Sequence, residues 1–280
     1  MVAPASRAPG KGLVAMPAIL TNDISIHYDQ RGTGLPTLFV AGLGQDHTAW
    51  NLQMEAFAHR RCIAPDNRGA GASAAPPGPY TSWIMAADLA GLLRALELGP
   101  VDVVGLSMGG IVAQTLAELF PDHVRSMCVV GSWASTSEYQ RRLFAGWASA
   151  YRRGGLELFL DVAVAASFSR RSFERPGFVD ALLTAALAAE RRMSPEAFEA
   201  QAGACSTYGT GVRLDRIRCP SLVVCGRHDQ IAPVESSEEL ARLIPDAHLL
   251  IFEGSGHLPL WEETDAFNAA LLEFWAQVEG

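Results

Sequence analysis

The sequence lacks two features that would assign it to a broad class at once. No uninterrupted apolar run approaches the ~20 residues that a membrane-spanning helix needs, so we expect no membrane partner. No run rich in lysine and arginine occurs, and 22 basic residues against 30 acidic ones leave a net charge of −8. Nucleic acid is therefore not expected as a partner.

Cysteine is sparse and shows no pairing pattern. Five cysteines are present, an odd number, and no C-x-x-C pair occurs. Cys62, Cys128 and Cys225 fall inside or at the ends of apolar segments. We therefore expect buried free thiols in a reducing compartment, with neither disulfides nor a metal site. A cytoplasmic enzyme that needs no cofactor is the default expectation.

The residues that are present indicate a globular protein. The chain has 280 residues, of which 49% are hydrophobic, enough to bury a large core. Residues 1–16 are rich in alanine, proline and glycine, and their apolar stretch is too short for a signal peptide. We expect them to be a disordered extension or an expression remnant outside the fold.

Short apolar segments alternate with helix-length segments along most of the chain. These short segments are rich in valine, isoleucine and leucine without strict alternation, which is typical of strands covered on both faces. They lie at 37–41, 61–64, 101–105, 126–130, 221–225 and 248–252. Residues 24–28 alternate better and are expected to form an antiparallel edge strand. The order predicts an α/β fold with a mostly parallel sheet flanked by helices.

Residues 133–212 interrupt this alternation. They contain helical patterns but no convincing strand, and eighty residues are too many for an unstructured loop in a compact domain. We expect a helical cap here, inserted into a core made of residues 17–132 and 213–280.

A G-x-S-x-G sequence at 105–109 is the main candidate for a nucleophile. The pattern alone is weak, but an apolar strand leads into it and a helical pattern follows, as a nucleophile elbow requires. Glycines would relieve a strained, crowded turn. We therefore expect Ser107 to be a nucleophile at a helix N-terminus.

A serine hydroxyl needs a base, and the base needs an acid to orient it. Among seven histidines, His257 follows the last predicted strand, on the side where open α/β sheets bind ligands. His47 and His228 are expected to be pocket residues instead. Asp229 follows the preceding strand and gives the order Ser, Asp, His. We expect Asp229 to be the catalytic acid.

Two backbone N–H groups should stabilise the oxyanion of the intermediate. The residue after the nucleophile, Met108, is one predicted donor. Leu43, flanked by Gly42 and Gly44 in the loop after the strand at 37–41, is the other.

Taken together, these motifs resemble the α/β-hydrolase superfamily from about residue 19 to the C-terminus. Residues 66–73 look like the family's D-x-R-G-x-G-x-S loop. The segments at 77–81, 105–110, 151–156 and 214–220 are similar to 3-oxoadipate enol-lactonases and small carboxylesterases. The resemblance implies an eight-stranded type of sheet with a helical cap. Gly42-Leu43-Gly44 departs from the His-Gly or Asn-Ser type that is common in relatives.

The expected function is cleavage of a carboxylic ester or lactone through an acyl-enzyme. A carbon–carbon bond hydrolase, a non-hydrolytic biosynthetic catalyst and a ligand receptor are the alternatives. The expected partner is a small-molecule ester or lactone, and a homodimer is left open. Candidate pocket residues are Gly42, Trp133, Phe144, Trp147, Phe168 and Leu258.

Overall fold

The computed structural model describes residues 17–188, 192–209 and 211–280, so the expected extension at 1–16 lies outside the described residues. Within them, eight strands form one sheet in the order β1-β2-β4-β3-β5-β6-β7-β8. The strands are β1 (Ala18–Thr21), β2 (Ile24–Arg31), β3 (Pro36–Val40), β4 (Arg61–Pro65), β5 (Val101–Leu106), β6 (Val124–Val130), β7 (Ser221–Gly226) and β8 (Ala247–Phe252).

The sheet is mostly parallel, as predicted. Strands β3 to β8 pair in parallel, while β2 pairs antiparallel with β4. The expected antiparallel strand at 24–28 is present but is not the edge, because β1 pairs outside it. Only one of the four β1 residues is buried, so β1 carries little apolar signal in the sequence.

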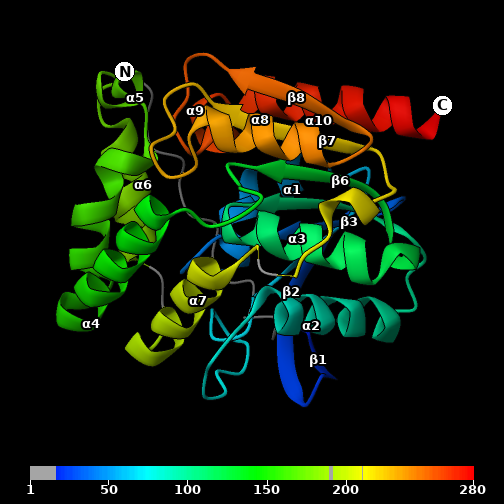
Figure 1. Cartoon of the computed structure of the whole chain (residues 1–280), viewed down its shortest axis with the longest axis horizontal. Helices are drawn as coiled ribbons and strands as arrows, with labels where there is room; N and C mark the ends of the chain where they lie inside the picture. Colours follow the sequence, from blue (N-terminus) through cyan, green and yellow to red (C-terminus); the bar gives the residue numbers. More distant parts are fainter. Residues whose placement is uncertain (1–16, 189–191, 210) are drawn as a thin grey trace, which may run out of the picture.

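Helices cover both faces of the sheet (Figure 1). On one face, side chains of α2, α3 and α8 share a core with the strands, and on the other α1 and α10 do so. The helices of these layers are α1 (Asn51–Ala56), α2 (Ser82–Ala95), α3 (Met108–Leu119), α8 (Val234–Leu243) and α10 (Thr264–Glu279). Short helical turns are η1 (His47–Trp50), η2 (Pro121–His123), η3 (Leu214–Arg216) and α9 (Pro259–Glu262).

In the part of the chain that the structure describes, four α-helices lie between β6 and β7, in the stretch expected to be helical. They are α4 (Glu138–Ser167), α5 (Arg170–Phe173), α6 (Phe178–Leu187) and α7 (Pro195–Thr207). We call residues 133–212 the helical insertion. Gly154 and Gly155 have non-helical backbone angles and divide α4 into two segments. Figure 1 shows α4, α6 and α7 beyond the end of the sheet toward which β8 points.

No helix in the described part of the chain is long and apolar enough to cross a membrane.

Candidate active site

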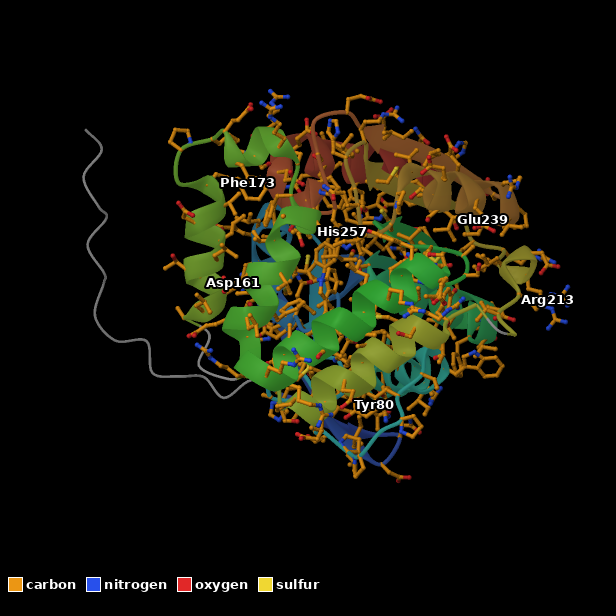
Figure 2. The ribbon with its side chains drawn as sticks, turned by 60° about the vertical axis from the view of Figure 1, so that its left-hand side comes forward. Tyr80, Asp161, Phe173, Arg213, Glu239 and His257 are labelled. Carbon is orange, nitrogen blue, oxygen red and sulfur yellow. The ribbon has the colours of Figure 1, made fainter. Side chains whose placement is uncertain are left out.

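The structure brings the three predicted catalytic residues together at the carboxyl ends of the parallel strands. Ser107 follows β5, Asp229 lies shortly after β7 and His257 shortly after β8. Because β5 to β8 are neighbouring parallel strands, their carboxyl ends meet at the same edge. All three side chains are buried. Figure 2 shows His257 where the helices of the insertion meet the core.

Ser107 occupies a strained turn between β5 and α3. Its φ of 54° and ψ of −113° are unfavourable for a residue with a side chain, which costs on the order of 1–3 kcal/mol. The Ser107 N–H donates to the Val130 carbonyl at 2.7 Å. The Ser107 carbonyl accepts from the N–H of Gly110 at 2.9 Å and from the Ser132 hydroxyl at 3.1 Å. The surrounding hydrogen bonds therefore hold the strained conformation.

The two glycines of the pentapeptide allow the close packing of this turn. A Cβ on Gly109 would lie 2.1 Å from the Val40 carbonyl oxygen, and one on Gly105 would lie 2.3 Å from the Gly109 carbonyl oxygen. No side chain fits at such distances. The expected steric need for glycine at both positions is confirmed.

His257 and Asp229 form a buried pair. Nδ1 of His257 lies 2.8 Å from Oδ2 of Asp229. The other carboxylate oxygen of Asp229 accepts from the backbone N–H groups of Ile231 at 2.8 Å and Ala232 at 2.9 Å. These contacts fix the carboxylate, and a carboxylate at Nδ1 holds the Nδ1–H tautomer, which leaves Nε2 as the basic nitrogen.

The predicted oxyanion donors lie on either side of Ser107. Met108 is the first residue of α3, so its N–H has no partner within the helix. In the opposite loop, the N–H of Gly42 donates to the Gln45 side chain and that of Gly44 to Gln201. Within residues 17–188, 192–209 and 211–280, the intervening Leu43 N–H has no recorded partner. The role of the Leu43 and Met108 amides as oxyanion donors stays a prediction.

Of the predicted pocket residues, Gly42 lies beside Ser107, and the others are buried in the cores on the two faces of the sheet. A Cβ on Gly42 would lie 3.5 Å from the Ser107 Cβ. Trp133, Phe144 and Trp147 are buried in the same core cluster as Leu43 and Met108. Phe168 and Leu258 are buried in the cluster on the opposite face of the sheet.

An aromatic row runs through the insertion to the loop that carries Leu43. Successive ring centroids are 4.9 to 5.8 Å apart along Trp133, Phe144, Trp147, Phe159 and Phe198. A Cβ on Gly44 would lie 2.8 Å from the Phe198 ring. The aromatic row of the insertion therefore ends in contact with the loop that carries Leu43.

Two polar residues at the site were not predicted from the sequence. Gln201 of α7 accepts from the Gly44 N–H at 3.0 Å and donates to the Arg68 carbonyl at 2.9 Å. Glu262 of α9 accepts hydrogen bonds from the loop around His257 and from the insertion. A lone acid after Leu-Pro-Leu-Trp is a weak signal for Glu262, and the sequence around Gln201 offers none.

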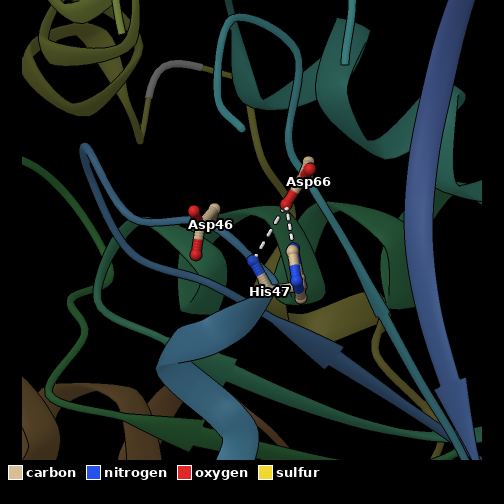
Figure 3. Close-up of side chains that lie close together, drawn as sticks. All are labelled: Asp46, His47 and Asp66. Atoms are coloured by element: carbon tan, nitrogen blue, oxygen red, sulfur yellow. Dashed lines mark hydrogen bonds and ion pairs between the residues drawn. The ribbon is translucent and has the colours of Figure 1, made fainter. Parts of the chain in front are cut away.

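Asp46, His47 and Asp66 form a cluster in which one potential metal-ligand atom of each residue lies within 4.8 Å of the others (Figure 3). The carboxylates of this cluster already accept hydrogen bonds from other groups of the protein. One oxygen of Asp66 accepts from the His47 N–H at 2.9 Å and lies 2.8 Å from His47 Nδ1, and the other accepts from the Ala72 N–H at 2.8 Å. Asp46 caps η1 through the Thr48 N–H. We assign this cluster a structural role in bracing the loops beside the site.

The charge environment of His47 favours its protonated form. Burial alone would lower the pKa of His47, but the hydrogen bond and charge of Asp66 outweigh it, with Asp46 and Asp29 adding to the effect. The pKa of His47 is therefore raised above its usual value.

Comparisons with known proteins agree with this architecture. Residues 36–264 match the family described as alpha/beta hydrolase fold. The chain is 30% identical over 274 residues to 2-hydroxy-6-oxo-2,4-heptadienoate hydrolase of Pseudomonas putida, covering 92% of this chain and 95% of that protein. A thermophilic esterase from Thermogutta terrifontis superposes with a TM-score of 0.85 at 30% identity, covering 95% of this chain and 100% of the esterase. The enol-lactonase of Burkholderia xenovorans does so with a TM-score of 0.84 at 26% identity, covering 93% and 100%.

Proposed function

Because this chain belongs to the α/β-hydrolase family, we propose that it cleaves a carboxylic ester or lactone through an acyl-enzyme. Ser107 would be the nucleophile, His257 the general base and Asp229 the orienting acid. One observation carries this proposal: His257 Nδ1 lies 2.8 Å from Asp229 Oδ2, at the same end of the sheet as the strained Ser107. The esterase and enol-lactonase that share the fold support it.

The proposed reaction has two halves. His257 Nε2 takes the Ser107 proton as Oγ attacks the substrate carbonyl, and it then gives the proton to the departing alkoxide. Water next attacks the acyl-enzyme, again with His257 as base, and releases the acid and free Ser107. The backbone N–H groups of Met108 and Leu43 would bind the oxyanion in both halves, and each such donor is typically worth about 10²–10³ in rate.

The side chains around the site favour an apolar substrate group. The aromatic row ends beside Gly44, next to the proposed donor Leu43. Aromatic walls gain binding energy from burying apolar area, at about 25 cal/mol per Å². We therefore expect esters with apolar acyl or alcohol groups to react faster than esters with charged ones.

A carbon–carbon bond hydrolase is the second candidate. The relative from Pseudomonas putida carries a name of that kind and covers almost the whole chain. The same three residues could serve such a reaction, because both chemistries act at a carbonyl carbon.

A panel of p-nitrophenyl esters of increasing acyl length tests the first proposal. We expect turnover of at least one ester, loss of turnover by about 10⁴-fold or more in Ser107→Ala, and a mass increase at Ser107 after reaction with a fluorophosphonate. Wild-type protein that labels at Ser107 but hydrolyses no ester would favour the carbon–carbon hydrolase. Near-normal ester hydrolysis by Ser107→Ala would contradict both candidates.

A further inference from the structure

Glu262 is a buried carboxylate at the junction between the His257 loop and the helical insertion. Its side chain belongs to α9 of the core and is only 6% exposed. In the described part of the chain, no arginine, lysine or histidine forms an ion pair with this carboxylate. Burying a carboxylate costs free energy unless hydrogen bonds compensate for the lost water. The groups that donate to Glu262 therefore help to stabilise this junction.

One carboxylate oxygen of Glu262 holds the loop that carries His257. Oε1 accepts from the Gly256 N–H at 2.8 Å and, more weakly, from the Leu258 N–H at 3.4 Å. These two amides flank His257 on both sides. A displacement of Glu262 would therefore move the backbone from which the imidazole projects.

The other oxygen of Glu262 holds the insertion. Oε2 accepts from the Ser169 N–H at 2.8 Å and from the Ser172 hydroxyl at 2.7 Å. A third link joins the same two parts, because the His257 N–H donates to the Ser167 carbonyl at the end of α4 at 2.9 Å. Three consecutive residues of the His257 loop are thus linked to the insertion: Gly256 and Leu258 through Glu262, and His257 directly.

We propose that Glu262 is a positioning residue for His257, and that it couples the seating of the helical insertion to the placement of the base. The proposal rests on the proposed role of His257 as general base. The insertion then does more than shape the pocket. When Ser169 and Ser172 leave Glu262, the carboxylate loses two of its four donors and is no longer fixed from the insertion side, so the His257 loop bound to its other oxygen can shift with it. Binding a substrate against the insertion would in turn hold His257 in its reactive position.

Glu262→Gln tests the proposal, because the amide keeps the shape but turns an NH₂ toward one pair of donors. We expect kcat on the best p-nitrophenyl ester to fall about 10- to 100-fold, as displacement of a catalytic group does, while KM changes little. We also expect the low-field proton resonance of the His257–Asp229 hydrogen bond to shift or broaden. That resonance is read in the resting protein, so it tests the positioning of His257 even if no ester is turned over.

Asp102→Asn is the matched control. Asp102 is another buried carboxylate, bound by Arg60, Arg125 and Ser126 near the start of β5, at the opposite end of the sheet from Ser107. We expect this variant to melt at a lower temperature with unchanged kcat and an unchanged low-field resonance.

Ser172→Ala keeps the test decisive if Glu262→Gln does not fold. It removes one donor from the insertion side alone, and we expect a several-fold fall in kcat with a smaller shift of the same resonance. Wild-type kcat and an unshifted resonance in either folded variant would overturn the proposal. An equal loss of kcat in Asp102→Asn would overturn it too, since the effect would then be general destabilisation.

Discussion

Gly131 lies directly against the imidazole of His257. A Cβ on Gly131 would be 2.8 Å from His257 Nδ1 and 3.2 Å from Asp229 Oδ2. Because the methyl group of Gly131→Ala would push the imidazole aside, we expect kcat to fall by up to about 10²-fold with little change in KM. Steady-state kinetics on a p-nitrophenyl ester measures the effect.

Gly177→Ala is the control for backbone strain in that experiment. Gly131 has a φ of 55° and Gly177 a φ of 70°, so alanine is strained at both positions. No described heavy atom lies within 4 Å of a Cβ on Gly177. If Gly177→Ala lowered kcat as much as Gly131→Ala, strain rather than contact with His257 would be the cause.

The orientation of His257 depends on the charge and acceptor capacity of Asp229. In Asp229→Asn the side chain keeps its size but can present an NH₂ to His257 Nδ1, which favours the wrong tautomer. We expect kcat to fall by about 10⁴-fold, as in other triads, while circular dichroism and the melting temperature change little. A loss of less than tenfold would mean that another acid orients His257.

The sequence predicts the sheet and the positions of the three proposed catalytic residues because their signals are local. The strand at 101–105 and the glycines at 105 and 109 lie next to Ser107, and Asp229 and His257 each lie shortly after an apolar strand. The parallel pairing of β5 to β8 then brings these strand ends together without further information. Strand β1 gave no such signal because its residues are mostly unburied.

The polar links between the insertion and the core could not be predicted, because they join distant residues. Gln201 binds Gly44, which is 157 positions away, and Glu262 binds Ser169, which is 93 positions away. Neither residue belongs to a local motif, and apart from the Ser172 hydroxyl their hydrogen-bond partners are backbone groups, which carry no sequence signal. Only the three-dimensional structure shows that these two side chains are buried and that they bind the loops of Leu43 and His257.

Gln201 should matter for the proposed oxyanion hole. In Gln201→Leu the Gly44 N–H and the Arg68 carbonyl lose their partner while the buried volume stays similar. We expect the Leu43 amide to become less ordered and kcat to fall about 10-fold, less than the ~10²–10³ for the loss of a donor itself. Kinetics of Gln201→Leu beside wild type measures this.

The control for Gln201 is Thr37→Val. Thr37 is also fully buried, but its hydroxyl accepts from Arg60 Nε at 2.8 Å near the start of β3, at the end of the strand away from the Leu43 loop. We expect Thr37→Val to lower the melting temperature without lowering kcat. Equal loss of kcat in the two variants would show that Gln201 acts through stability alone.

The thiols should be unreactive in the native protein. Burial raises the pKa of Cys62, Cys219 and Cys225 to about 11, and the pKa values of Cys128 and Cys205 are also raised by burial. At pH 8 a thiol with a pKa of about 11 is only ~0.1% thiolate, the reactive form. We expect iodoacetamide at pH 8 to leave esterase activity nearly intact and a fluorophosphonate to abolish it. Rapid modification of a cysteine by iodoacetamide in the folded protein, located by mass spectrometry, would contradict the predicted unreactivity of the thiols.

His47 should make stability depend on pH. Its pKa is raised in the folded protein, mainly because Asp66 outweighs the opposing effect of burial. A raised folded pKa stabilises the protein fully below the unfolded value of about 6.5, and this contribution is lost as the pH rises through the folded pKa. His47→Gln removes the contribution, so the variant should lose more unfolding free energy at pH 5.0 than at pH 9.0. The loss at low pH should be about 1.5–3 kcal/mol, as for a hydrogen bond to a charged group.

Urea unfolding of wild type and variant at the two pH values measures that difference. The matched control is His248→Gln, because His248 lies on the exposed side of β8. Its effect on unfolding free energy should be small and similar at both pH values. A His47→Gln loss that is equal at the two pH values, or larger at pH 9.0, would show that the ion pair with Asp66 does not stabilise the fold. The loops that Figure 3 shows joined at Asp66 would then be held by the His47 and Ala72 backbone N–H groups alone.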